Sequence, residues 1–181
     1  MARGVNKGLQ IQITRTGGAP SLLGEVKDYL RIDSDDHDSL LGQLILSAVE
    51  RIESYCGVTI IPSIVSAFWR QLSSVEPLPY GPVVDVLDES GGEVIGIVPG
   101  FASVEPSGTG PVRIDYAAGY SIDPDTPISL PEGLRLAIIK LVTDDFEQRT
   151  GVLVAGRQVV QILPNNWKES ARPYRRASWV M

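Results

Sequence analysis

The sequence predicts an α+β fold, with long helices on either side of a small antiparallel β region. Apolar residues recur at steps of three and four over about residues 36–56 and 131–150, which predicts two long helices. Between these stretches, residues 58–116 hold short β-branched runs separated by Gly and Pro. Because the runs follow one another without a helical pattern, we expect their pairing to be local and antiparallel.

The first long helix is predicted at about residues 36–56. Acidic side chains in the segment 33–38 suit the positive end of its dipole, Ser34 or Asp35 can cap it, and Gly57 supplies a left-handed stop. A shorter helix is expected before it, at about 21–31, with Ser21 as its cap. The apolar stripe of the long helix consists of Leu40, Leu41, Leu44, Ile45, Ala48, Val49, Ile52 and Tyr55.

The second long helix is predicted to begin at Pro131, where the missing N–H costs nothing, and to end before Gly151. In the β region, Ser90-Gly91-Gly92 indicates a hairpin turn. The strands expected around it are Val58–Ile61, Ile64–Leu72, Val83–Leu87, Val94–Val98 and Val112–Tyr116.

With 181 residues, the chain is expected to form one globular unit with appendages. We expect residues 1–20 to be a Gly-rich N-terminal arm, in which Leu9–Thr14 alternates and can pair as an edge strand. Residues 21–150 would form the core, including the β insertion at 58–116, and residues 151–181 a C-terminal docking tail.

Charge is distributed unevenly along the chain. Residues 1–16 carry a net charge of +3, and residues 151–181 carry a net charge of +4. Because the whole chain has a net charge of −6, the residues between these ends carry −13. Basic ends on an acidic body suit contact between neighbouring copies, or a basic end that meets an acidic partner. The alternative is that both ends are solvated tails.

Several classes of protein are excluded by composition. No apolar run approaches the roughly 20 residues that span a membrane, and residues 1–18 lack the apolar core of a signal peptide, so we expect a protein made in the cytoplasm without membrane contact. Cys56 is the only cysteine, which rules out an internal disulfide or a multi-cysteine zinc site.

No set of residues calls for catalysis or for a cofactor. The acidic segment fails as a calcium loop because, counting from Asp33, its sixth and twelfth places hold Asp38 and Leu44. The single His37 and Cys56 lie about 28 Å apart on one predicted helix, too far for a nucleophile and its base. The glycine turns lack the Lys-Ser/Thr of a phosphate loop. We therefore predict no enzyme, no catalytic or metal residues and no cofactor.

The C-terminal segment mixes arginines with aromatics, a composition typical of binding surfaces. It could stack on nucleic acid, but a pI near 4.8 favours a protein partner. We expect residues 164–181 to be loosely packed alone and fixed on docking; the alternative is a tail that packs back on its own domain. The predicted docking residues are Trp167, Arg172, Tyr174, Arg175, Arg176 and Trp179.

The order of short motifs along the chain resembles that of phage head-tail connector (adaptor) proteins. The resemblance spans roughly residues 20–176. The motifs that carry it are Val26-Lys27-Asp28-Tyr29-Leu30-Arg31-Ile32, residues 35–41, residues 48–57, Tyr116-Ala117-Ala118-Gly119-Tyr120, Leu130-Pro131-Glu132-Gly133-Leu134, Asp145-Phe146-Glu147-Gln148-Arg149 and Pro173-Tyr174-Arg175.

The resemblance implies a structural subunit of the virion neck, at the interface of head and tail. Such a subunit would form a dodecameric ring that docks on the portal protein, would meet a downstream neck or tail-completion protein, and would let genomic DNA pass through its channel as cargo. It implies a helical bundle with a β insertion and no catalytic residues. The alternatives are a small DNA-binding regulatory protein and, more distantly, an unassigned small enzyme.

Overall fold

The computed structural model describes residues 8–98, 101–121, 128–147 and 166–176. The chain divides into two compact units. One is formed by residues 1–18 and 57–130 and contains the strands, and the other is formed by residues 19–56 and 131–181 and contains the helices.

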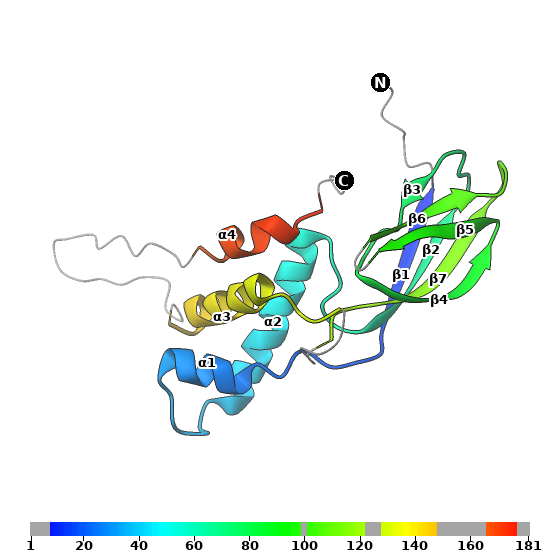
Figure 1. The fold of residues 1–181 in the computed structure, drawn as a ribbon. Helices are drawn as coiled ribbons and strands as arrows, with labels where there is room; N and C mark the ends of the chain where they lie inside the picture. Colours follow the sequence, from blue (N-terminus) through cyan, green and yellow to red (C-terminus); the bar gives the residue numbers. More distant parts are fainter. Residues whose placement is uncertain (1–7, 99–100, 122–127, 148–165, 177–181) are drawn as a thin grey trace. The chain divides into compact units, whose positions relative to one another are not determined.

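The helical unit is built around two helices that pack on each other, α2 (Asp38–Cys56) and α3 (Glu132–Glu147) (Figure 1). The short helix α1 (Leu23–Leu30) contacts both, and α4 (Trp167–Ala171) lies against α3 and continues into the 3-10 helix η1 (Arg172–Tyr174). Apolar positions spaced by three and four residues form the buried faces of α2 and α3. These are Leu41, Ile45, Ala48, Val49 and Ile52 of α2, and Leu134, Ala137, Ile138, Leu141 and Val142 of α3.

The prediction of a bundle of long helices with a β insertion is wrong. The described residues contain four α-helices, two of them of eight residues or fewer, together with two antiparallel sheets that form a unit of their own. The helices expected at 36–56 and 131–150 are observed at Asp38–Cys56 and Glu132–Glu147. A helix of one or two turns cannot add a full bundle layer, so much of the chain's burial comes from sheet packing.

The strands form two antiparallel sheets (Figure 1). The four-stranded sheet has the order β1-β2-β7-β4, and the three-stranded sheet has the order β3-β6-β5. Neighbouring β2 and β7 pair without interruption, from Ser63 opposite Ala118 to Trp69 opposite Val112. The strands span Leu9–Arg15 (β1), Ser63–Trp69 (β2), Glu76–Pro77 (β3), Val83–Ser90 (β4), Gly92–Val98 (β5), Phe101–Pro106 (β6) and Val112–Ala118 (β7).

The core of this unit follows from the alternation of side chains along its central strands. Every second residue of β2 and β7 is buried, as expected for strands with one face on a core. Tyr116 is the largest fully buried side chain, and its hydroxyl donates a 3.2 Å hydrogen bond to the Tyr80 carbonyl. The polar end of this ring is thereby satisfied.

Two parts of the sheet differ from the predicted strands. Val58–Ile61 is not a strand; its residues are buried, and isolated backbone bonds such as Thr59 N–H to Gly81 O (2.7 Å) hold it. Conversely, β6 (Phe101–Pro106) was not predicted and pairs with both β3 and β5. The alternating stretch in the N-terminal arm does pair as an edge strand, as β1.

Gly91, with φ of +77°, makes the turn between β4 and β5, which belong to different sheets and do not pair as the predicted hairpin. A Cβ there would lie 2.3 Å from the Pro111 carbonyl oxygen, so only glycine fits the predicted turn.

In the part of the chain that the structure describes, no helix is both long enough and apolar enough to cross a membrane.

Candidate docking surface

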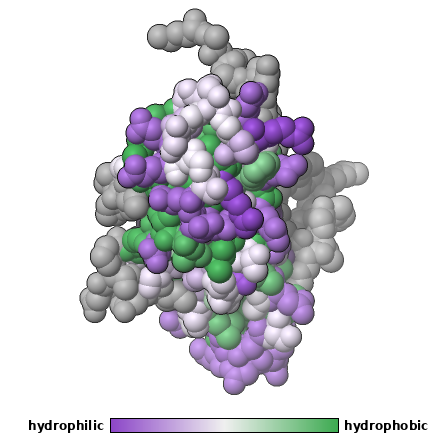
Figure 2. Space-filling view, turned by 90° about the vertical axis from the view of Figure 1, so that its right-hand side faces the viewer, coloured by the Kyte–Doolittle hydropathy of each residue, from purple (hydrophilic) through white to green (hydrophobic). Residues whose placement is uncertain are grey.

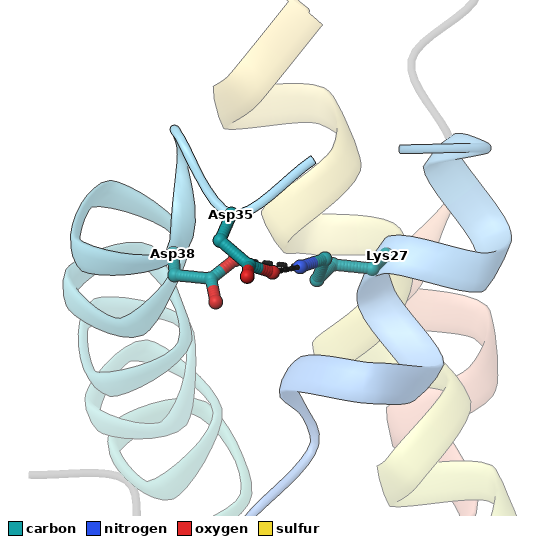
Figure 3. Close-up of polar contacts among 3 residues, drawn as sticks. All are labelled: Lys27, Asp35 and Asp38. Atoms are coloured by element: carbon teal, nitrogen blue, oxygen red, sulfur yellow. Dashed lines mark hydrogen bonds and ion pairs between the residues drawn. The ribbon is translucent and has the colours of Figure 1, made fainter. Parts of the chain in front are cut away.

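The segment between α1 and α2 is held by one lysine. Lys27 Nζ donates to Asp35 Oδ1 at 2.6 Å and to Asp38 Oδ1 at 2.9 Å, so it bridges the loop and the first turn of α2 (Figure 3). Asp38 lies in the first turn of α2, as expected for an acid at the positive end of the helix dipole, and it also binds Lys27. The expected cap of α1 differs, since Leu22 rather than Ser21 occupies the N-cap position.

The ion pairs of Lys27 with Asp35 and Asp38, here called the Lys27 clasp, shift the pKa values of Lys27 and Asp35. The hydrogen bonds from the Lys27 ammonium group lower the pKa of Asp35, and those to Asp35 and Asp38 raise the pKa of Lys27. A lowered carboxyl pKa stabilises the fold above the unfolded pKa of 3.8, and that contribution is lost as the pH falls through the folded value. The raised lysine pKa contributes stability below 10.5 that is lost at higher pH.

We expect Lys27→Met to lower the melting temperature by a few degrees at pH 7, since exposed pairs contribute little each but this lysine holds two. Because Asp35 is protonated in acid, the difference from the wild type should narrow toward zero as the pH is lowered below its folded pKa. Asp36→Asn, in the same exposed loop, is the matched control and should leave the thermal transition unchanged. A difference between Lys27→Met and wild type that stays constant from pH 7 to pH 3 would exclude the clasp.

The C-terminal segment lies on the helical unit. Ala171 of α4 is fully buried, and its carbonyl is 3.5 Å from the Sγ of Cys56 at the end of α2. The Arg176 N–H donates to the Cys56 carbonyl at 2.9 Å, and Lys140 Nζ of α3 donates to Ser170 Oγ at 3.1 Å. Residues 166–176 are therefore fixed to both α2 and α3.

Two of the predicted docking residues meet at Tyr55 of α2. The Trp167 ring lies edge-on to the Tyr55 ring with centroids 5.3 Å apart, and the Arg175 guanidinium lies 5.1 Å from the Tyr55 centroid. Both arrangements are favourable aromatic and cation–π geometries. Beside this cluster is an open groove of about 490 Å³, lined by Ser47, Glu50, Arg51, Ser54, Tyr55 and Trp167.

The other predicted docking residues are distributed around η1. Arg172 is exposed, and Arg176 is half-buried. The half-buried ring of Tyr174 lies against Gly133, where a Cβ would be 2.6 Å from Tyr174 Cε2 and 2.8 Å from its hydroxyl. Trp179 lies outside the described residues. We give the name tail surface to the residues of α2 and Trp167 that line the groove, together with the exposed Arg172 and Arg175 of the C-terminal segment.

The packing of residues 166–176 differs from the loosely packed segment expected from the sequence and follows the alternative, a tail that packs back on its own unit. The reason is that Ala171 and the Tyr174 ring find apolar sites on α2 and α3 that periodicity did not reveal. Tyr55 was missed as a surface residue, because its place at the end of an apolar stripe is typical of core. The role of the tail in docking stays a prediction.

The described residues contain no metal-binding cluster, and both Cys56 and His37 pack within the helical unit. Groups of three or more His, Cys, Asp or Glu side chains placed to hold a metal ion are not found in the described ranges. Burial raises the pKa of the Cys56 thiol to about 11, against a smaller lowering by Arg175. A thiol so protonated is a poor nucleophile near neutral pH. The His37 ring packs edge-on to Phe146, with centroids 5.5 Å apart.

Comparison with known families gives a match over about a third of the chain, in its N-terminal part. The model of the family described as phage gp6-like head-tail connector protein matches residues 21–83. This range contains α1, the Lys27 clasp, α2 and β2. The resemblance to head-tail connector proteins is confirmed. The comparison with curated proteins finds no match.

Solved structures with the same fold come from phage-like particles. A chain in the neck of an empty GTA particle computed with C6 symmetry is 18% identical, with a TM-score of 0.67, and the match covers 93% of this chain and 97% of that one. Chains in the neck of the native GTA particle computed with C12 symmetry and in the virion of the native gene transfer agent particle match with the same identity and coverage, and with TM-scores of 0.65 and 0.61. The fold that this chain shares with these neck chains therefore extends over 93% of it, beyond the residues that the family model matches.

Proposed function

We propose that this chain is a structural head-tail connector (adaptor) subunit in the neck of a tailed phage or phage-like particle. It forms a ring that docks on the portal and extends the DNA channel toward the tail. The observation that carries the proposal is the family match over α1, α2 and β2, together with a fold that covers 97% of a neck protein's chain. Its role is structural rather than enzymatic.

The same comparison supports the proposed ring. A similar chain occurs in a neck computed with C12 symmetry, and a dodecameric ring suits a subunit that must match a portal above it and a neck or tail-completion protein below it. DNA passes as cargo: the described body carries many exposed carboxylates, which repel phosphates and keep the genome from adhering. No observation favours a DNA-binding regulator.

Docking on the portal is assigned to the tail surface. Arg172 and Arg175 are exposed, and Arg175 lies over Tyr55, which lines the groove. Arginine makes forked, charge-assisted bonds to carboxylates. Tyr55 and Trp167 supply aromatic area beside them. This combination fits an acidic, partly apolar segment of a protein partner.

The test is to mix the purified protein with portal rings from the same particle and image the product by electron microscopy. We expect one adaptor ring per portal. The double variant Arg172→Glu/Arg175→Glu should bind the portal at least about tenfold more weakly per subunit, because forked ion pairs become like-charge contacts, and multivalency makes that loss decisive for the ring.

The matched control is Arg172→Lys/Arg175→Lys, which keeps both charges and loses the forked geometry, so its portal affinity should fall between wild type and the Glu variant. Both arginines are exposed, so we expect all three proteins to melt within a few degrees of one another. Wild-type protein that forms no ring with the portal would refute the connector function. Normal docking by the Glu variant would refute only the tail surface.

A further inference from the structure

The four-stranded sheet ends in two strands that differ in charge. With the order β1-β2-β7-β4, β1 and β4 are the outer strands, and in the described parts of the chain neither has a strand paired to its outer edge. An open edge invites pairing or packing with another chain unless it is protected.

The β1 edge is unprotected, and the one charged side chain of the strand is the basic Arg15. Its seven residues contain no Pro and pair with β2 in one unbroken register, without a bulge. Ile13 near its end is 43% exposed. Residues 1–24 contain three basic side chains and no acidic one. This edge therefore offers a strand flank with an exposed apolar side chain in a positive segment.

The β4 edge is acidic and also apolar. Val84 and Leu87 are 53% and 50% exposed, and the exposed carboxylates of Asp85 and Asp88 lie next to them in the strand. Residues 71–112 contain six acidic side chains and no basic one. Figure 2, which faces the strand-rich side of Figure 1, shows apolar green areas directly beside polar purple ones.

We propose that β1 of one copy packs against β4 of a second copy, and that this contact joins neighbouring subunits of the ring. The inference rests on the proposed function and names the surface that builds the ring. Opposite charge on the two edges attracts, and Ile13 of one copy would cover Val84 and Leu87 of the next. Because the contact joins two different edges, each copy keeps one edge for the next neighbour, as a closed ring requires.

The irregular shape of β4 defines the kind of contact. Its register with β7 shifts between Val83 and Asp85 and again between Val86 and Asp88. Bulges of this kind twist an edge and interrupt a continuous ladder of backbone bonds. The contact is therefore made mainly by side chains, which makes its strength depend on charge and apolar area.

The test uses the full chain under conditions in which the wild type forms rings, alone or on portal rings. Ile13→Asp places a carboxylate opposite the acidic β4 edge and should raise the concentration needed for ring formation by about tenfold or more. Ile13→Lys removes the same apolar side chain but introduces a positive charge, which the acidic β4 edge attracts. This variant should therefore form rings at nearly the wild-type concentration. Val75→Asp, at a 49% exposed valine outside both edges, should leave assembly unchanged.

A mixing experiment tests the pairing of unlike edges. Leu87→Asp should block the β4 edge as Ile13→Asp blocks the β1 edge, so each variant alone should sediment as a monomer. Mixed in equal amounts, they should form a one-to-one dimer that does not grow, since only one intact edge of each kind remains. Rings formed equally well by Ile13→Asp and wild type, or a mixture that stays monomeric, would overturn the inference. Wild type without rings on or off the portal would overturn the proposed function and this interface with it.

Discussion

A chain that ends at residue 165 should unfold at a lower temperature and should expose its single cysteine. The removed segment contributes the buried Ala171 and the half-buried rings of Trp167 and Tyr174 to the helical unit. Losing two partly buried aromatics costs about 2–4 kcal/mol. For a unit of roughly 90 residues, this loss corresponds to a melting temperature lower by about 10 °C or more.

The reactivity of the Cys56 thiol also measures the loss of the C-terminal segment. In the intact chain Cys56 is 1% exposed, and burial raises the pKa of its thiol to about 11 from an ordinary value of 9.0. Without the tail the thiol becomes accessible and its pKa returns toward the ordinary value, so at pH 8 the thiolate fraction increases by about a hundredfold. The rate of reaction with an aromatic disulfide reagent should increase by at least that factor.

The matched control for this truncation is a chain that ends at residue 176. It retains α4, η1 and the bond from Arg176 N–H to the Cys56 carbonyl, and its thiol should react as slowly as that of the full chain. Cys56→Ser in the shorter chain should abolish the signal, since no other cysteine is present. Equal reaction rates at pH 8 for the chains that end at 165 and 176 would show that the tail does not cover α2.

The helices were predictable where a long apolar stripe coincides with clear end signals. For α2, acidic residues at the start and Gly57 with φ of +67° at the end mark both ends of the helix. Strands were less predictable. The run Val58–Ile61 has the composition of a strand but crosses the core without strand pairing, whereas β6 contains Ser, Glu and Pro and owes its structure to pairing with β3 and β5.

The tail surface could be predicted only in part. Arginines and aromatics indicated binding, and Trp167 and Arg175 do gather in space. The residue that joins them, Tyr55, comes from α2, more than a hundred positions earlier in the chain. The five residues of α4 are too few to show a helical period, so neither the buried side of Ala171 nor its site on α2 could be read from spacing.

Gly133→Ala should release the tail although alanine is the better helix former. In the first turn of α3, glycine costs about 1 kcal/mol relative to alanine, so without a neighbour the substitution would stabilise the helix. Here the added Cβ would lie 2.6 Å from Tyr174 Cε2, closer than atoms can approach, and the ring must leave its site. Once Tyr174 leaves, η1 and Arg175 lose their support, and Cys56 should react about tenfold or more faster with the thiol reagent.

A double-mutant cycle separates this contact from any general effect on α3. In the Tyr174→Ala background the site of the ring is empty, so adding Gly133→Ala should leave the thermal transition unchanged or raise it slightly. In the wild-type background the same substitution should lower the transition and increase thiol reactivity. The effect of Gly133→Ala on the thermal transition therefore depends on Tyr174, and the coupling energy between positions 133 and 174 should exceed about 1 kcal/mol. If Gly133→Ala has the same effect in both backgrounds, the motif at residues 130–134 does not hold the tail through Tyr174.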